Sequence, residues 1–129
     1  MGRIRQLIDV QGRPSWTLFD SGARNTYVIP VVAALLTTSE VAHPFRTALG
    51  GSIQETNTTA LLDAEIEGHP ISTHAMVIDH IGQDDDGRPI EVRLGALAMQ
   101  QWGIRLIPEQ EAIDLTHYPN EFVEFMADC

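Results

Sequence analysis

An acidic residue at the end of an apolar strand constrains this chain more than any other feature. Residues 16–19 read Trp-Thr-Leu-Phe, and Asp20, Ser21 and Gly22 follow directly, before Ala23. The apolar neighbours carry the carboxylate toward the protein interior, where a buried acid needs a partner or a functional reason. An Asp-Ser-Gly sequence alone is also a common surface turn, so the apolar context decides between the two interpretations.

This acidic loop occurs only once in 129 residues. Two carboxylates that share a proton can activate water for peptide hydrolysis, one as base and the other as acid. A chain with a single loop must take its second carboxylate from another copy of itself. The sequence therefore predicts a homodimer in which each chain contributes Asp20 to a shared site.

The composition indicates one globular domain, with 43% apolar and 20% charged residues. A net charge of −10 repels phosphate backbones, so we expect no nucleic acid partner. The longest apolar run, residues 27–36, contains Pro30 and is too short to cross a bilayer, so we expect no membrane segment. The single cysteine is Cys129 and the start lacks a signal-peptide pattern, which favours a cytoplasmic protein.

The alternation of apolar and polar residues predicts an all-β domain. Two hairpins are expected. The first comprises residues 4–10 and 15–19. The second comprises residues 62–66 and 71–77 and is expected to form a central antiparallel pair. Further short strands are expected at residues 90–94, 104–106 and 113–115. Helix propensity predicts one short helix over residues 96–102, stopped by Gly103, and a short buried helical segment over residues 31–36.

No metal or other cofactor is expected. The histidines lack metal-ligand spacing, and they are His43, His69, His74, His80 and His117. Residues 84–87 read Asp-Asp-Asp-Gly, which lacks the alternating acids of a calcium loop and is typical of a solvated turn.

Four features in order resemble the retropepsin family, the single-domain aspartic proteases of retroviral type. They are the acidic loop at residues 20–23, a glycine-bearing flap at residues 48–53, a long hairpin at residues 61–78, and a strand and glycine that open a short helix at residues 92–103. The resemblance covers residues 4–115.

The resemblance implies a closed, barrel-like all-β fold with one short helix in its C-terminal half, assembled as a symmetric homodimer. The protease-like domain would comprise residues 1–116. Residues 117–129 form a tail with apolar positions at Phe122, Val123, Phe125 and Met126. This tail would either pack as a terminal helix or strand, or complete the dimer or cover the cleft.

The resemblance also implies an aspartic endopeptidase that cleaves peptides or proteins, with apolar side chains preferred around the cleaved bond. Asp20 would be the catalytic acid, Ser21 would bond across the dimer, and Gly22 and Ala23 would line the cleft. The flap over the substrate would be formed by Leu49, Gly50, Gly51 and Ser52.

Two departures from the family pattern keep other functions open. Arg24 and Ala96 stand where the retroviral enzymes usually have an acid and its arginine partner, and the flap has a single Gly-Gly pair. These changes suit a non-catalytic dimeric module of the same fold that binds peptides or assembles. A third possibility is an unrelated acidic β-domain with a chance motif, which predicts a folded monomer.

Overall fold

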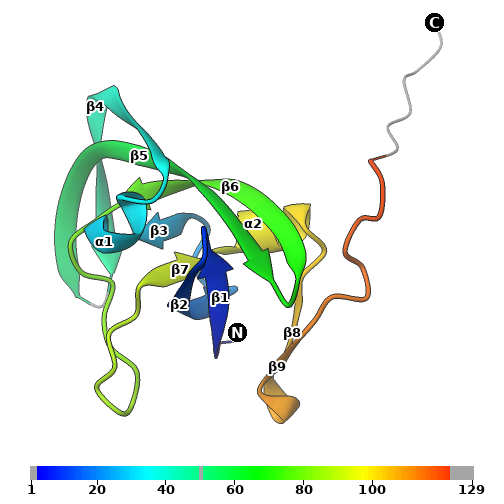
Figure 1. Cartoon of the computed structure of the whole chain (residues 1–129). Coiled ribbons are helices and arrows are strands. Elements are labelled where there is room, and N and C mark those ends of the chain that lie inside the picture. The colour runs from blue at the N-terminus through cyan, green and yellow to red at the C-terminus, as the bar shows by residue number, and fades with distance from the viewer. Residues whose placement is uncertain (1–2, 50, 123–129) are drawn as a thin grey trace, which may run out of the picture.

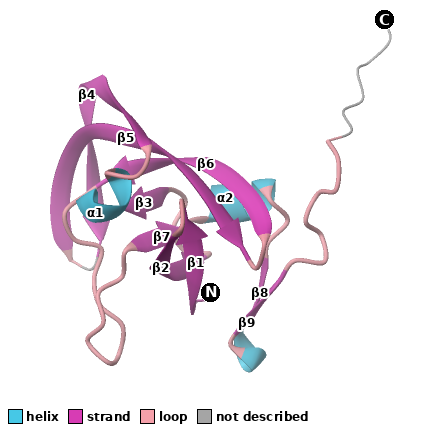
Figure 2. Ribbon diagram, in the orientation of Figure 1, coloured by secondary structure: helices cyan, strands magenta, loops and turns pink. Residues whose placement is uncertain are grey.

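The computed structural model describes residues 3–49 and 51–122, and strands dominate it (Figures 1 and 2). The strands are β1 (Arg3–Val10), β2 (Arg13–Asp20), β3 (Thr26–Val28), β4 (Thr37–Leu49), β5 (Ser52–Ile66), β6 (His69–Val77), β7 (Val92–Leu94), β8 (Arg105–Ile107) and β9 (Ala112–Asp114). The helices are α1 (Pro30–Ala33), α2 (Ala96–Gln101) and the short 3-10 turn η1 (Pro108–Gln110). The predicted all-β class is confirmed.

Seven strands form one sheet in the order β1-β2-β7-β3-β6-β5-β4, and β8 and β9 form a separate pair. The first predicted hairpin is confirmed, since β1 and β2 pair from Arg3 opposite Asp20 to Val10 opposite Arg13. A further pairing of Asp9 with Glu65 joins β1 to β5, so the sheet curves back on itself.

The second predicted hairpin, β5 with β6, is also confirmed. Its alternating pattern buries Leu62, Ala64 and Ile66 on one face. Its expected central place is wrong, because β7 and β3 occupy the middle of the strand order. The strand β5 also begins well before the alternating segment and pairs there with β4, so the hairpin extends far beyond the flap predicted at residues 48–53.

The centre of the sheet is built from two three-residue strands. The strand β7 runs parallel to β2 and antiparallel to β3, and β3 runs parallel to β6. All three residues of β3 are buried. These pairings bring the end of β2 beside the end of β7, although the two segments lie far apart in the sequence.

Both predicted helices are present but shorter than expected. Pro30 occupies the first turn of α1, where its missing N–H costs nothing. The helix ends at Ala33, and the N–H groups of Leu35 and Leu36 then bond to carbonyls only three residues back, before β4 begins at Thr37. The helix α2 ends at Gln101, and Gly103 follows with a positive φ of 65°.

Alternating side chains of β2 enter two apolar clusters. Phe19 lies in the larger cluster together with Val92 and Leu94 of β7. Leu18 lies in the second cluster with Tyr27 and Leu49. Both faces of β2 near Asp20 are therefore buried.

The segment after β9 packs beside the start of β6 and the end of α2, where the Tyr118 ring lies 4.7 Å from that of His69 and 5.9 Å from that of Trp102 between centroids. Its last described residue, Phe122, has an edge-to-face contact with Trp102 at 5.8 Å between ring centroids. The remaining apolar tail positions lie outside the described residues, so the two predictions for the tail stay open. Among residues 3–49 and 51–122, no helix has the length and apolar character needed to cross a membrane.

Candidate active site

The carboxylate of Asp20 is buried at the end of β2, with 1% of the residue exposed. This burial agrees with the expectation from its apolar context. The N–H of Gly22 donates to Oδ1 of Asp20 at 2.8 Å, and the N–H of Ala23 donates to the Asp20 carbonyl at 3.2 Å. The turn thus fixes the orientation of the carboxylate, while Ser21 and Gly22 lie exposed at the surface.

Two arginines approach the other oxygen of Asp20, and neither was expected at the site. Nη2 of Arg93 donates to Oδ2 of Asp20 in a short ion pair, and Nε of Arg3 lies 3.5 Å from the same oxygen. Arg93 belongs to β7, where it is paired in register with Leu18 of β2. Its place between the buried residues Val92 and Leu94 was the signal in the sequence that could have revealed it.

The turn after Asp20 is bonded to the start of α2. The N–H groups of Ala96 and Leu97 donate to the carbonyls of Ala23 and Arg24 at 2.6 and 3.2 Å. The helix N-terminus therefore obtains backbone acceptors without a side-chain cap. The two segments are thus joined through the backbone, and the Arg24 side chain is exposed.

Gly95 allows this close approach. A Cβ at Gly95 would lie 2.2 Å from the carbonyl oxygen of Asn25, inside the contact distance of any real pair of atoms. The N–H of Gly95 donates to Oγ1 of the buried Thr26 at 3.1 Å. The helix-opening glycine thus has a steric reason in the structure.

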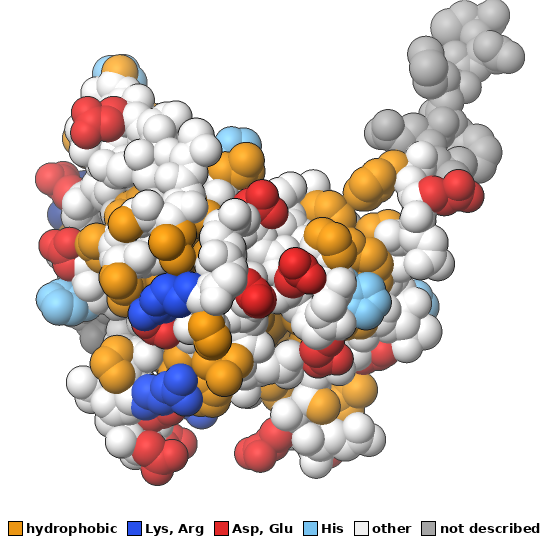
Figure 3. All heavy atoms as spheres, viewed as in Figure 1, with side chains coloured by type: hydrophobic (Ala, Val, Ile, Leu, Met, Phe, Trp, Pro, Cys, Tyr) orange, Lys and Arg blue, Asp and Glu red, His pale blue; other side chains and the backbone are white. Residues whose placement is uncertain are grey.

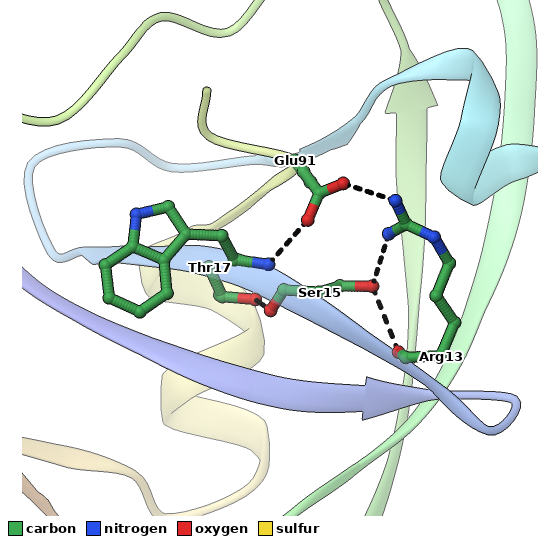
Figure 4. A network of polar contacts seen from close by, with 5 residues as sticks. Arg13, Ser15, Thr17 and Glu91 are labelled. Atoms are coloured by element: carbon green, nitrogen blue, oxygen red, sulfur yellow. Dashed lines mark hydrogen bonds and ion pairs between the residues drawn. The ribbon is translucent and has the colours of Figure 1, made fainter. Parts of the chain in front are cut away.

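A polar network holds β2 against the segment that leads into β7 (Figure 4). Glu91 accepts the N–H of Trp16 at 2.8 Å and pairs with Nη2 of Arg13 at 2.6 Å. Nη1 of Arg13 also donates to the buried hydroxyl of Ser15 at 3.2 Å. Burial opposes ionisation of Glu91, but these partners hold its pKa below the ordinary value of 4.5.

The predicted flap is the hairpin between β4 and β5. Leu49 and Ser52 are paired across the turn, Gly51 has a positive φ of 80°, and Gly50 lies outside the described residues. Leu49 packs into the second apolar cluster, while Ile53 is 65% exposed. The hydroxyl of Thr47 donates to the Tyr27 hydroxyl at 3.0 Å, which connects the flap to β3.

The flap and Asp20 are therefore linked through one apolar cluster. Leu18, which precedes Asp20 by two residues, shares this cluster with Leu49 of the flap. Ser21 faces elsewhere and lines a cavity of about 490 Å³ between α2 and β8. Its predicted bond across a dimer stays a prediction, as do the roles of the other site residues.

Acidic side chains are scattered over the face in Figure 3, with arginines at a few places. Within residues 3–49 and 51–122, no three His, Cys, Asp or Glu side chains gather as a metal site would require.

Comparison with known proteins gives matches among solved structures. No family model matches the sequence, and no curated protein does. Among solved structures, the chain is similar to the retroviral protease-like domain of Ddi1 from Leishmania major, with a TM-score of 0.63 over 90% of each chain. The fold is retroviral protease-like. At 15% sequence identity the likeness shows the fold alone.

Proposed function

We propose that this chain is an aspartic endopeptidase that acts as a homodimer. One ionised Asp20 takes a proton from a water molecule as the water oxygen attacks the scissile carbonyl carbon. The protonated Asp20 of the second copy gives its proton to the carbonyl oxygen. The first Asp20 then passes the water proton to the amide nitrogen as the C–N bond breaks, and the second Asp20 takes a proton back from a hydroxyl of the intermediate, so that a carboxylic acid and an amine are released and the pair is restored. The reaction needs two carboxylates and no metal.

The observation that carries this proposal is the buried Asp20 at a strand end of a retroviral protease-like fold, oriented by the N–H of Gly22 at 2.8 Å. A buried acid held by a tight turn is suited to chemistry because its geometry is fixed before substrate arrives. In the dimer, Ser21 would bond to the partner, and Gly22 and Ala23 would line the cleft.

The rest of the fold suits an extended peptide. The sheet, in which β1 also pairs with β5, would supply the floor of the cleft. The flap residues Leu49, Gly50, Gly51 and Ser52 would cover the peptide, and the exposed Ile53 would contact substrate or the second copy. We infer that the enzyme works in the cytoplasm on peptide or protein substrates, without nucleic acid or membrane partners.

The test is cleavage of an unfolded protein between about pH 4 and about pH 7, with the unchanged chain and Asp20→Asn compared at a temperature where both are folded. Asp20→Glu is a useful companion, because it keeps the charge while moving the carboxylate. We expect cleavage by the unchanged chain, a strong loss in Asp20→Glu and none in Asp20→Asn. Size-exclusion chromatography should show a dimer under the same conditions.

A second candidate function is favoured by one observation. Oδ2 of Asp20 is already paired with Arg93 and lies near Arg3, as a purely structural carboxylate would be. A non-catalytic dimeric module of this fold would bind peptides or serve in assembly without cleaving peptides. Binding of a pepstatin-type inhibitor separates the two functions. A working pair of Asp20 carboxylates should bind the inhibitor, and Asp20→Asn should abolish this binding, whereas a non-catalytic module should not bind it.

A further inference from the structure

Each oxygen of Asp20 has at least one partner within the single chain. Oδ1 accepts the N–H of Gly22, while Oδ2 pairs with Arg93 and faces Arg3. A carboxylate that activates water must offer one oxygen to that water. Oδ1 can accept a second hydrogen bond, but the guanidinium on Oδ2 weakens the carboxylate as a base, so a group that draws Arg93 away from Oδ2 favours the proposed reaction.

Arg93 lies on the side of the sheet that the flap covers. Its neighbours Val92 and Leu94 point into the larger core, so Arg93 points to the opposite face. Its register partners on either side are Leu18 and Tyr27, both members of the cluster that contains Leu49 of the flap. The guanidinium is thus beside Asp20 on the floor where a bound peptide would lie.

The guanidinium of Arg93 also has unused bonding capacity. Its Nε is buried, and no acceptor for it is found among the described residues. The side chain is 12% exposed, so it is shielded from water although it carries a charge. A planar guanidinium with a free donor matches a second carboxylate well.

The charges at the site are not balanced. One carboxylate faces two guanidinium groups, which leaves a local positive excess in a chain whose net charge is −10. An anionic group on the substrate would complement this excess.

We propose that Arg93 selects peptides with an Asp or Glu side chain next to the cleaved bond, an inference that rests on the proposed peptidase function. The substrate carboxylate takes over the guanidinium, and Oδ2 of Asp20 becomes free to bind the attacking water. Because Arg93 touches Asp20 itself, the acidic residue must directly flank the scissile bond. A neutral substrate offers no replacement partner, so it must break the buried ion pair without compensation. This preference differs from the apolar one that the family resemblance implies.

The experiment compares peptides capped at both ends that differ only by Glu or Gln on one side of the cleaved bond. We expect the unchanged chain to cleave the Glu peptide with a kcat/KM about tenfold or more higher than the Gln peptide. Arg93→Gln should remove this difference and raise the kcat/KM for the Gln peptide, whereas Arg93→Lys should retain a preference. Arg105→Gln, an exposed arginine on β8, is the matched control and should keep the full preference.

The outcomes separate the two proposals. Equal cleavage of both peptides by the unchanged chain, or a preference that survives in Arg93→Gln, overturns the role of Arg93 and leaves the peptidase standing. Absence of any Asp20-dependent cleavage overturns the peptidase, and the inference falls with it. If an Arg93 variant does not fold, equal cleavage of the two peptides by the unchanged chain still overturns the role of Arg93.

Discussion

Arg93 in the middle of β7 forms an ion pair with Asp20 at the end of β2, with only 12% and 1% of the two side chains exposed. Removal of one member of a buried pair leaves the other charge without compensation. We expect Asp20→Asn to lower the free energy of unfolding by about 3 kcal/mol. Arg93→Gln should cost less, because Arg3 remains near the carboxylate. Urea unfolding measures both.

A double-mutant cycle tests whether the two effects share one cause. The double variant should lose less than the sum of the single losses, with a coupling of about 1–3 kcal/mol. Arg46 and Glu55 form the matched control, a pair at 3.7 Å with 68% and 63% of the side chains exposed. Their coupling should stay below about 1 kcal/mol. Similar coupling in the two pairs would contradict a special role for burial at Asp20.

Gly95 should tolerate no side chain. In Gly95→Ala the added Cβ would meet the Asn25 carbonyl oxygen, 2.2 Å away, and separate the turn from α2. We expect a loss of about 3 kcal/mol in urea unfolding. Gly87→Ala is the control, because Gly87 has a φ of +81° but open space around it. Its loss should be about 1 kcal/mol, from backbone conformation alone. Equal losses would show that the close approach is unimportant.

Tyr27 should restrain the flap through its hydroxyl. Tyr27→Phe removes the acceptor of the Thr47 hydroxyl and should cost about 1 kcal/mol of stability. We also expect faster amide hydrogen exchange near the flap end of β4. Tyr118→Phe serves as control, since it removes a bond to the Pro70 carbonyl elsewhere in the fold. It should lower stability and leave exchange in β4 unchanged; faster exchange in both variants would indicate a global effect.

Strands with one buried and one solvent-exposed face were predictable from the sequence, and the other strands were not. Leu62, Ala64 and Ile66 alternate with acids and mark β5 directly. In contrast, β4 is exposed at nearly every position and has no apolar period, so only its pairing with β5 defines it. The strand β3 is buried on both faces and has three residues, too few for alternation to appear.

The candidate site shows the same division between local and distant information. Asp20 and its turn were predictable because the apolar strand before them is contiguous in sequence. The partner Arg93 lies 73 positions away and reaches Asp20 only through the parallel pairing of β2 with β7. A single sequence shows a charged residue between two apolar ones there, but it does not show which residue faces it.

Glu91 should make stability depend on pH. Arg13 and the N–H of Trp16 lower its pKa below 4.5 against the opposing effect of burial. A carboxylate whose pKa is lower in the folded state adds stability above its unfolded pKa, and this contribution is lost as pH falls through the folded value. Glu91→Gln should therefore be less stable than the unchanged chain near neutral pH, and the difference should shrink as pH falls below about 4.5.

The expected loss in Glu91→Gln near neutral pH is about 1 kcal/mol, since an amide keeps one hydrogen bond but loses the charge that faces Arg13. Urea unfolding at about pH 7 and about pH 3 measures it. Glu40→Gln, at an exposed position of β4, should have little effect at either pH. A loss in Glu91→Gln that is equally large at both pH values would mean that the side chain supports β2 and β7 through its shape and hydrogen bonds, and that its charge contributes nothing.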